Sequence, residues 1–294
     1  MNVASETKAL SANNKANNQV VLVMMFLVPA LLPFGRLSEL PILVLALTGM
    51  VAMVKNHGNF LSQARIKKFS LCFGLYFLLM TLSSLDSYWS DKSWLVTLSS
   101  WRFYFAGLAV LAYWPQDRFQ GIKTLLICLT ALLTFWALDA LVQYALGQDL
   151  FGIESYPGRL SGVFGMNVKL GPVLALFLPF ALMVLKQQSV WMRWAVVVLL
   201  LLVIVLSGTR SAWLMAAFVM LVFWWTQVRG RRLLLMAKSL LFVVLAGAIL
   251  WQISPDFKQS VTRSAAIFQG DSIGLDFALA DRLPIWRPAW EMFK

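Results

Sequence analysis

Long apolar stretches separated by short polar connections recur along almost the whole chain. Each stretch is close to the ~20 residues that a helix needs to cross a bilayer core of about 30 Å. Proline and glycine within several of them fit this interpretation, because both are common in membrane helices. We predict an all-α polytopic membrane protein with about nine transmembrane helices. These are expected at residues 19–35, 38–54, 69–85, 94–114, 122–146, 167–185, 190–206, 209–227 and 234–252.

The composition excludes a soluble globular protein. The 294 residues are 60% hydrophobic and 13% charged, and their mean hydropathy is +0.74, whereas soluble domains are about 45–50% apolar. Mostly polar residues precede the first stretch without a small-residue cleavage site, which favours a retained helix over a signal peptide. We therefore expect a polar tail at 1–18, a transmembrane domain at 19–252 and a segment outside the membrane at 253–294.

Lysine and arginine predict the orientation, because these residues stay on the cytoplasmic side of short connections. With the N-terminus inside, the inner segments carry fourteen basic and two acidic residues, whereas the outer segments carry ten of each. We therefore predict a cytoplasmic N-terminus and an outer location for the segment after residue 252. A basic inner face attracts anionic head groups, so the charge predicts membrane lipids and no nucleic acid as partners.

The histidine and the cysteines predict neither a metal site nor a disulfide. His57 lies in an inner connection, where a lone histidine is usually solvated, and Cys72 and Cys128 lie within apolar stretches. The sequence also lacks clustered metal ligands and a glycine-rich nucleotide loop. We expect no metal and no cofactor.

Two outer connections carry basic residues that are candidates for binding an anion. Arg210 lies in VLSGTRSAWL at the edge of an apolar stretch, and Arg159 and Lys169 lie in ESYPGRLSGVFGMNVKLGP. The planar fork of arginine matches the geometry of phosphate and carboxylate groups. The alternatives are that Arg210 only reaches the interface while small neighbours let helices approach closely, and that the connection of Arg159 is an ordinary turn-rich loop.

Arg102 and Asp139 are predicted to lie inside the membrane, where ionisable side chains are costly and often functional. At 1.5 Å per residue, both are expected at roughly 10–12 Å below the outer surface. We predict that they form a structural ion pair that positions an outer cavity; direct participation in chemistry is the alternative.

The segment 253–294 is mixed in polarity and contains Arg263 and the sequence ALADRLPIWRPAWEMFK. Its tryptophans next to arginines are typical of an element that lies at the membrane interface. The alternative is that Arg282 and Arg287 face a lipid-linked substrate.

The motifs SGTRSAWL, upstream GRLSGVFGMN and downstream DRLPIWRPAW resemble, in this order, the O-antigen ligase family and its superfamily of Wzy-type O-antigen polymerases. The resemblance implies a GT-C-like, metal-independent glycosyltransferase of the bacterial inner membrane with its active face in the periplasm. Such ligases transfer O-antigen from undecaprenyl pyrophosphate to lipid A-core. The resemblance makes Arg210 and Arg282 the catalytic candidates, with Arg263 and Arg287 competing for the second role. Arg159, Lys169, Arg263 and Arg287 are the substrate-binding candidates.

One feature of the family is missing from this sequence. The resemblance implies a histidine in the periplasmic loop and further helices after it, whereas His57 lies on the opposite side. We therefore expect 253–294 to be the start of the periplasmic loop domain, and the 294 residues alone to be an inactive N-terminal portion or a truncated copy. Alternative functions are a polysaccharide polymerase or a protein O-oligosaccharyltransferase with the same donor, and a transporter.

Overall fold

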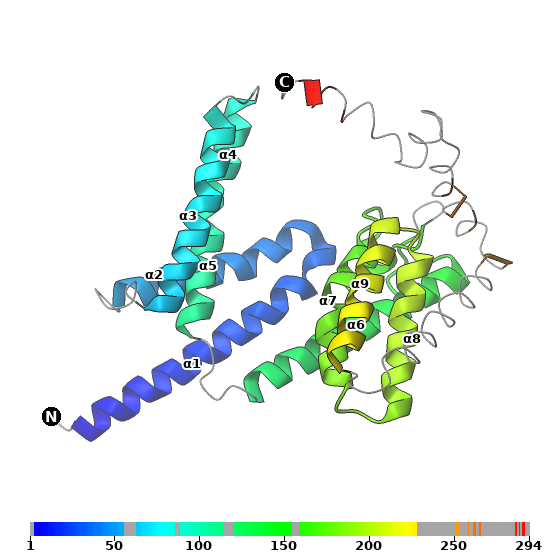
Figure 1. The fold of residues 1–294 in the computed structure, drawn as a ribbon. Helices are drawn as coiled ribbons and strands as arrows, with labels where there is room; N and C mark the ends of the chain where they lie inside the picture. Colours follow the sequence, from blue (N-terminus) through cyan, green and yellow to red (C-terminus); the bar gives the residue numbers. More distant parts are fainter. Residues whose placement is uncertain are drawn as a thin grey trace. The chain divides into compact units, whose positions relative to one another are not determined.

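The computed structural model describes residues 3–55, 63–85, 87, 89–113, 120–154 and 159–227, together with isolated positions between 251 and 291. Helices dominate these ranges, which contain no β-strand, although Gln148 and Glu154 form an isolated antiparallel bridge. The elements, drawn in Figure 1, are α1 (Val3–Ala30), η1 (Leu32–Ser38), α2 (Glu39–Lys55), α3 (Ala64–Leu85), α4 (Ser90–Ser99), α5 (Trp101–Ala112), α6 (Gln120–Leu146), η2 (Gly162–Phe164), α7 (Leu170–Leu185), α8 (Val190–Leu206) and α9 (Arg210–Gln227).

Four helical stretches are long and apolar enough to cross a membrane: Leu32–Lys55, Ala64–Leu85, Ser90–Ala112 and Gly121–Leu146. Shorter apolar helices cover Ala16–Ala30, Leu170–Leu185, Val190–Leu206 and Arg210–Phe223. The all-helical membrane character is thus confirmed for the described part of the chain. The count of nine stays a prediction, because most of the stretch 234–252 lies outside the described residues. The orientation also stays a prediction, because it rests on the charge pattern of the sequence.

The first predicted helix, 19–35, was placed too far along the chain: α1 ends at Ala30. Pro33 has no backbone N–H to continue the helical hydrogen bonds, and Gly35 adopts a positive φ of 64°, which favours glycine. The chain therefore passes through the short 3₁₀ segment η1 before α2 begins at Glu39.

The chain divides into two compact units between Leu129 and Thr130, within α6. In the first unit, α2 packs extensively along α5. Gly49 of α2 makes this possible, since a Cβ there would overlap the backbone carbonyl of Phe105. Small residues allow such close approach between membrane helices. The packed side chains around this contact include Val21, Leu45, Ala52, Ile66, Leu108, Ala109 and Tyr113.

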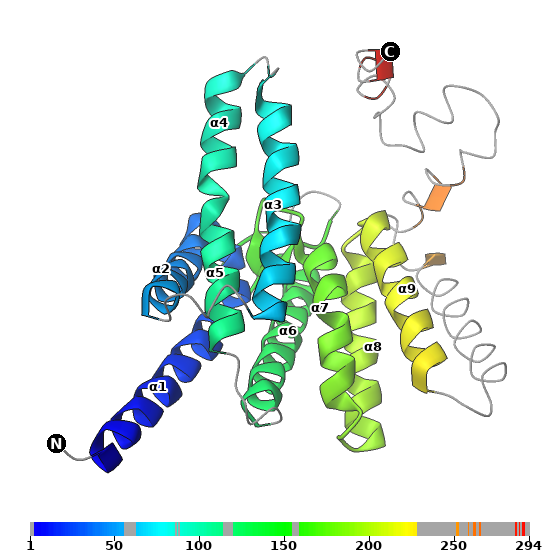
Figure 2. The same cartoon turned by 60° about the vertical axis from the view of Figure 1, so that its left-hand side comes forward.

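An aromatic cluster joins α3 to α5 in the same unit, and Figure 2 shows α3 beside α4 and α5. The rings of Phe69 and Tyr104 stack with centroids 5.8 Å apart, and Trp101 meets Tyr104 edge-on at 5.5 Å. The Tyr104 hydroxyl also hydrogen-bonds Ser70 at 2.9 Å. Aromatic pairs of this kind add to the packing that holds α3 in place.

In the second unit, α7 packs against both α8 and α9, and the three helices lie side by side in Figures 1 and 2. Buried leucines recur along α7 at the spacing of one helix face. They are Leu170, Leu174, Leu178, Leu182 and Leu185. Short connections at 186–189 and 207–209 separate the helices, so successive helices run in opposite directions. The start of α7 and the α8–α9 connection therefore lie at the same end.

Candidate functional site

The connection between α8 and α9 is the tight turn of Ser207, Gly208 and Thr209. Ser207 is buried and its hydroxyl donates to the Ile204 carbonyl at 2.7 Å. Gly208 has a φ of 65°, a left-handed conformation that commonly ends helices and favours glycine. The turn thus explains why the SGTRSAWL motif contains Ser207 and Gly208. Arg210 follows the turn as the first residue of α9.

Trp213 of α9 stabilises this turn by hydrogen bonding, a role that sequence reasoning missed. Its indole Nε1–H lies 3.1 Å from the Ile204 carbonyl oxygen and 3.2 Å from that of Val205. The last carbonyls of a helix have no partner within the helix itself. A side chain of α9 thus donates hydrogen bonds to the last carbonyl groups of α8. These bonds hold the first turn of α9, which contains the half-buried Arg210, against the end of α8.

The first turn of α7 packs directly against this connection. A Cβ on Gly171 would overlap the Ser207 hydroxyl, lie 2.9 Å from the Ser207 Cβ and lie 3.4 Å from the Ala212 Cβ. The N-terminal ends of α7 and α9 are therefore neighbours. The exposed Lys169 precedes α7 as its N-cap, and Arg210 opens α9.

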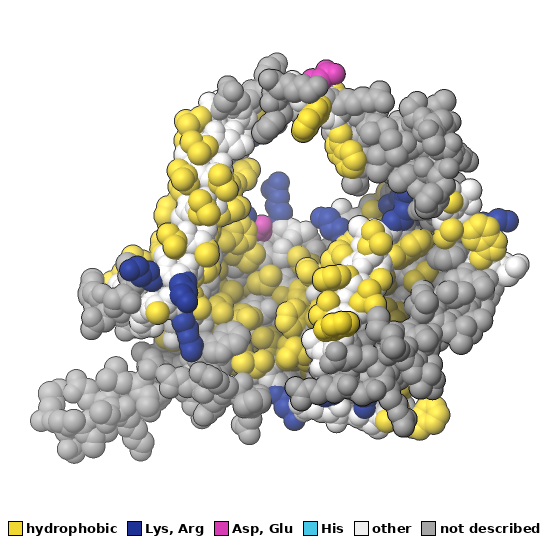
Figure 3. Space-filling view, in the orientation of Figure 1, with side chains coloured by type: hydrophobic (Ala, Val, Ile, Leu, Met, Phe, Trp, Pro, Cys, Tyr) yellow, Lys and Arg dark blue, Asp and Glu magenta, His cyan; other side chains and the backbone are white. Residues whose placement is uncertain are grey.

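Two helix N-termini and two cationic residues lie at this end of the bundle. Helix N-termini present unpaired N–H groups and a partial positive charge, and they are common sites for phosphate. Lys169 and Arg210 add two cationic side chains where two such ends meet. Figure 3 shows hydrophobic side chains across the middle of the part of the molecule that contains α9, with lysine and arginine side chains above and below them.

The connection from α6 to α7 carries Arg159, which is exposed. Behind it, Leu160, Ser161 and Gly162 are buried. A Cβ on Gly162 would lie 3.3 Å from both the Ala140 Cβ of α6 and a Leu170 methyl group of α7. The part of the connection that follows Arg159 is therefore inserted between the two helices.

Buried polar side chains on α6 hold this connection, and sequence reasoning overlooked Gln143. Gln143 accepts hydrogen bonds from the N–H groups of Ser161 and Gly162 at 3.3 and 2.7 Å and donates to the Ile153 carbonyl at 3.1 Å. Asp139 is fully buried and accepts from Leu150 N–H at 3.0 Å. The sequence did contain a signal for Gln143. It lies four positions after Asp139 on an otherwise apolar helix, so the two polar residues share one helix face.

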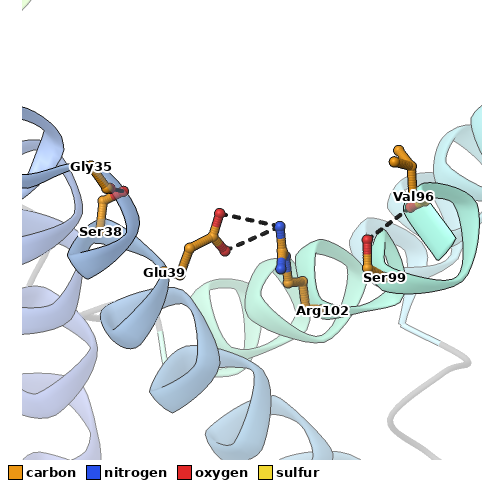
Figure 4. Close-up of polar contacts among 6 residues, drawn as sticks. All are labelled: Gly35, Ser38, Glu39, Val96, Ser99 and Arg102. Atoms are coloured by element: carbon orange, nitrogen blue, oxygen red, sulfur yellow. Dashed lines mark hydrogen bonds and ion pairs between the residues drawn. The ribbon is translucent and has the colours of Figure 1, made fainter. Parts of the chain in front are cut away.

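Arg102 forms its ion pair with Glu39, as Figure 4 shows. The Arg102 Nη2 lies 3.1 and 3.2 Å from the two carboxylate oxygens, and both side chains are about one-third exposed, at 31% and 37%. Sequence reasoning chose Asp139 as the partner from its expected depth. Asp139 accepts a hydrogen bond from the connection after its own helix. Arg102 and Asp139 belong to different units, so a pairing between them stays a prediction.

The remaining candidates, Arg263, Arg282 and Arg287, lie outside the described residues. Among the described ranges, the predicted site residues that the fold brings to one end of the second unit are Lys169 and Arg210. The described part of the chain contains no group of three or more His, Cys, Asp or Glu side chains suited to a metal ion.

Comparison with known families supports the motif-based resemblance. The model of the family described as O-antigen ligase (Wzy_C) matches residues 195–294. No curated protein and no solved structure matches the chain. The matched residues include most of α8, the SGTR turn and α9, whereas GRLSGVFGMN precedes them. The resemblance inferred from the motifs thus agrees with the family match, which covers residues 195–294.

Proposed function

We propose that this protein is an inner-membrane glycosyltransferase that transfers O-antigen from undecaprenyl pyrophosphate to lipid A-core. The observation that carries the proposal is the position of Arg210. It opens α9 within the residues that match the O-antigen ligase family, and the Gly171–Ser207 contact places it beside the start of α7. Lys169 and two helix N-termini thus surround one end of the bundle with positive charge.

This arrangement suits a pyrophosphate leaving group. In the transfer, an acceptor hydroxyl oxygen attacks the anomeric carbon of the donor sugar and its proton passes to a general base. The bond from that carbon to the phosphate oxygen breaks, and the pyrophosphate leaves with the electron pair. Negative charge grows on the leaving oxygen, where Arg210 and Lys169 stabilise it. Fixed charges that face a developing anion are often the largest catalytic contribution.

The predicted orientation supports the same location. With the N-terminus in the cytoplasm, the connections that contain Arg159, Lys169 and Arg210 all fall on the periplasmic side. The start of α7 and the α8–α9 turn are also neighbours in the structure. The charge pattern and the helix packing both support a location of Lys169 and Arg210 at one end of the bundle. Arg263, Arg282 and Arg287 would add further positive charge from the periplasmic segment.

The test is deletion of the complete reading frame, followed by a lipopolysaccharide gel and quantification of lipid-linked glycan. We expect lipid A to lose its O-antigen while undecaprenyl-linked polymer accumulates, and the intact gene to restore both. Collapse to single-repeat chains would instead indicate a polymerase. An unchanged lipopolysaccharide pattern would contradict the proposal, and the protein-linked glycans would then be measured for an oligosaccharyltransferase.

A further inference from the structure

The connection between α6 and α7 has two limbs that one side chain joins. The first limb, 147–154, follows α6, and the second, 159–169, leads to α7. The side-chain amide of Gln143 donates to Ile153 of the first limb and accepts from Ser161 and Gly162 of the second. Gln143 is only 1% exposed. Loss of its amide would leave the Ile153 carbonyl and the buried N–H groups of Ser161 and Gly162 without this partner.

The second limb is attached to the same face of α6 by apolar contacts. Trp136 meets Phe164 edge-on with ring centroids 5.4 Å apart, and Ala140 contacts the position of Gly162. Residues 136, 140 and 143 follow the spacing of one helix face. Gln143 is the polar end of this docking face.

Two candidate anion-binding residues flank the docked part of the second limb. Arg159 lies two positions before Ser161, and Lys169 lies five positions after Phe164. The side chains of both are exposed, whereas Ser161, Gly162 and Phe164 between them are buried. The position of this buried backbone therefore determines the position of Arg159.

We propose that Gln143 is a positioning residue for donor binding: by joining the two limbs, it holds Arg159 at the donor pyrophosphate. This inference rests on the proposed function. Gln143 itself does not touch the donor and acts through Arg159. An amide is suited to this role because one side chain supplies both an acceptor and a donor. Methionine has a similar length and volume but donates no hydrogen bond, so Gln143→Met removes the junction while it preserves the packing.

The first experiment measures the junction without relying on activity. Trypsin cleavage after Arg159 in the purified complete protein requires the buried Leu160 and Ser161 to leave their positions. We expect Gln143→Met to accelerate this cleavage about tenfold by favouring local opening. Gln148→Met is the matched control, because the same change is made at an exposed glutamine. Equal cleavage rates in the wild type and Gln143→Met would overturn the inference.

The second experiment separates positioning from general stability. We expect Gln143→Met to raise the KM for the lipid-linked donor about tenfold with little change in kcat of the folded protein. In a double-mutant cycle with Arg159→Ala, the combined variant should be no worse than Arg159→Ala alone, because Gln143 acts through Arg159. Additive effects would overturn the positioning role while the proposed function stands. If Arg159→Ala leaves transfer activity unchanged while Arg210→Ala lowers it, this inference fails and the proposed function stands. If the deletion strain keeps normal O-antigen, the proposed function fails.

Discussion

Gly171 and Ser207 lie so close together that a methyl group on residue 171 would overlap the Ser207 side chain. This contact joins the beginning of α7 to the turn before α9. Because Lys169 is two residues from Gly171 and Arg210 is three residues from Ser207, their separation depends on the absence of a side chain at position 171.

Gly171→Ala is expected to force α7 away from the α8–α9 turn. Inserting a methyl group into a packed contact costs about 1–3 kcal/mol. Thermal unfolding in detergent should therefore begin at a lower temperature, and transfer activity should fall. Gly74→Ala is the control, because no atom lies within 4 Å of the position of its Cβ. The second substitution Ser207→Gly should restore part of the loss by removing the clashing side chain; no recovery would show that the contact is not the cause.

Arg210→Ala should lower the transfer rate by about 10²–10³, the usual cost of losing one group that stabilises a developing anion. Arg210→Lys should recover little, because lysine keeps the charge but lacks the planar fork. Rates would be measured in membrane vesicles with lipid-linked donor and compared with those of Lys186→Ala, a variant at the opposite end of α7. Activity of Arg210→Ala within a few-fold of the wild type would refute the role of this arginine.

Trp213→Phe is expected to lower the free energy of unfolding by about 1 kcal/mol, since the indole N–H donates to carbonyls at the end of α8 and phenylalanine cannot. The expected readout is an earlier thermal transition in detergent. Trp191→Phe provides the control, because the Trp191 side chain is 87% exposed. Equal shifts for both variants would show that the hydrogen bonds of Trp213 do not contribute.

The partner of Arg102 can be identified by two double-mutant cycles. Glu39→Gln and Arg102→Met should each destabilise the protein, because each leaves a partly buried charge without its partner. Their combination should be less harmful than the sum of the two effects. The cycle of Arg102→Met with Asp139→Asn should be additive if Glu39 is the relevant partner. Coupling to Asp139 in place of Glu39 would support the pair expected from the sequence.

The apolar pattern predicted most helices because the length of a stretch reflects the thickness of the bilayer. The stretch predicted at 190–206 coincides with α8 (Val190–Leu206), and the stretch at 209–227 begins one residue before α9. Hydropathy does not record hydrogen bonding, however. The helix predicted at 94–114 is divided at Ser100 into α4 and α5. There the hydroxyls of Ser99 and Ser100 bond to backbone carbonyls one turn earlier.

The site residues that the sequence suggested are the charged ones. Arg159, Lys169 and Arg210 were recognised because the outer segments carry no excess of basic residues, so each cation there needs its own explanation. Gln143 and Trp213 were not, because their roles depend on which backbone groups lie opposite them after folding. The same limit applies to Arg102: its expected depth did not reveal that α2, and with it Glu39, packs against α5.

The hydrogen bond from Trp213 to the end of α8 affects the free energy of substrate binding. Since α9 cannot shift its first turn without breaking this bond, the backbone of Arg210 is ordered when the protein folds and not when a substrate arrives. Binding then carries a smaller entropic penalty, and no reorientation of the helix end is needed as charge develops. In the proposed transfer, the mobile partner is the lipid-linked donor, which diffuses laterally in the membrane until its pyrophosphate meets a stationary arginine.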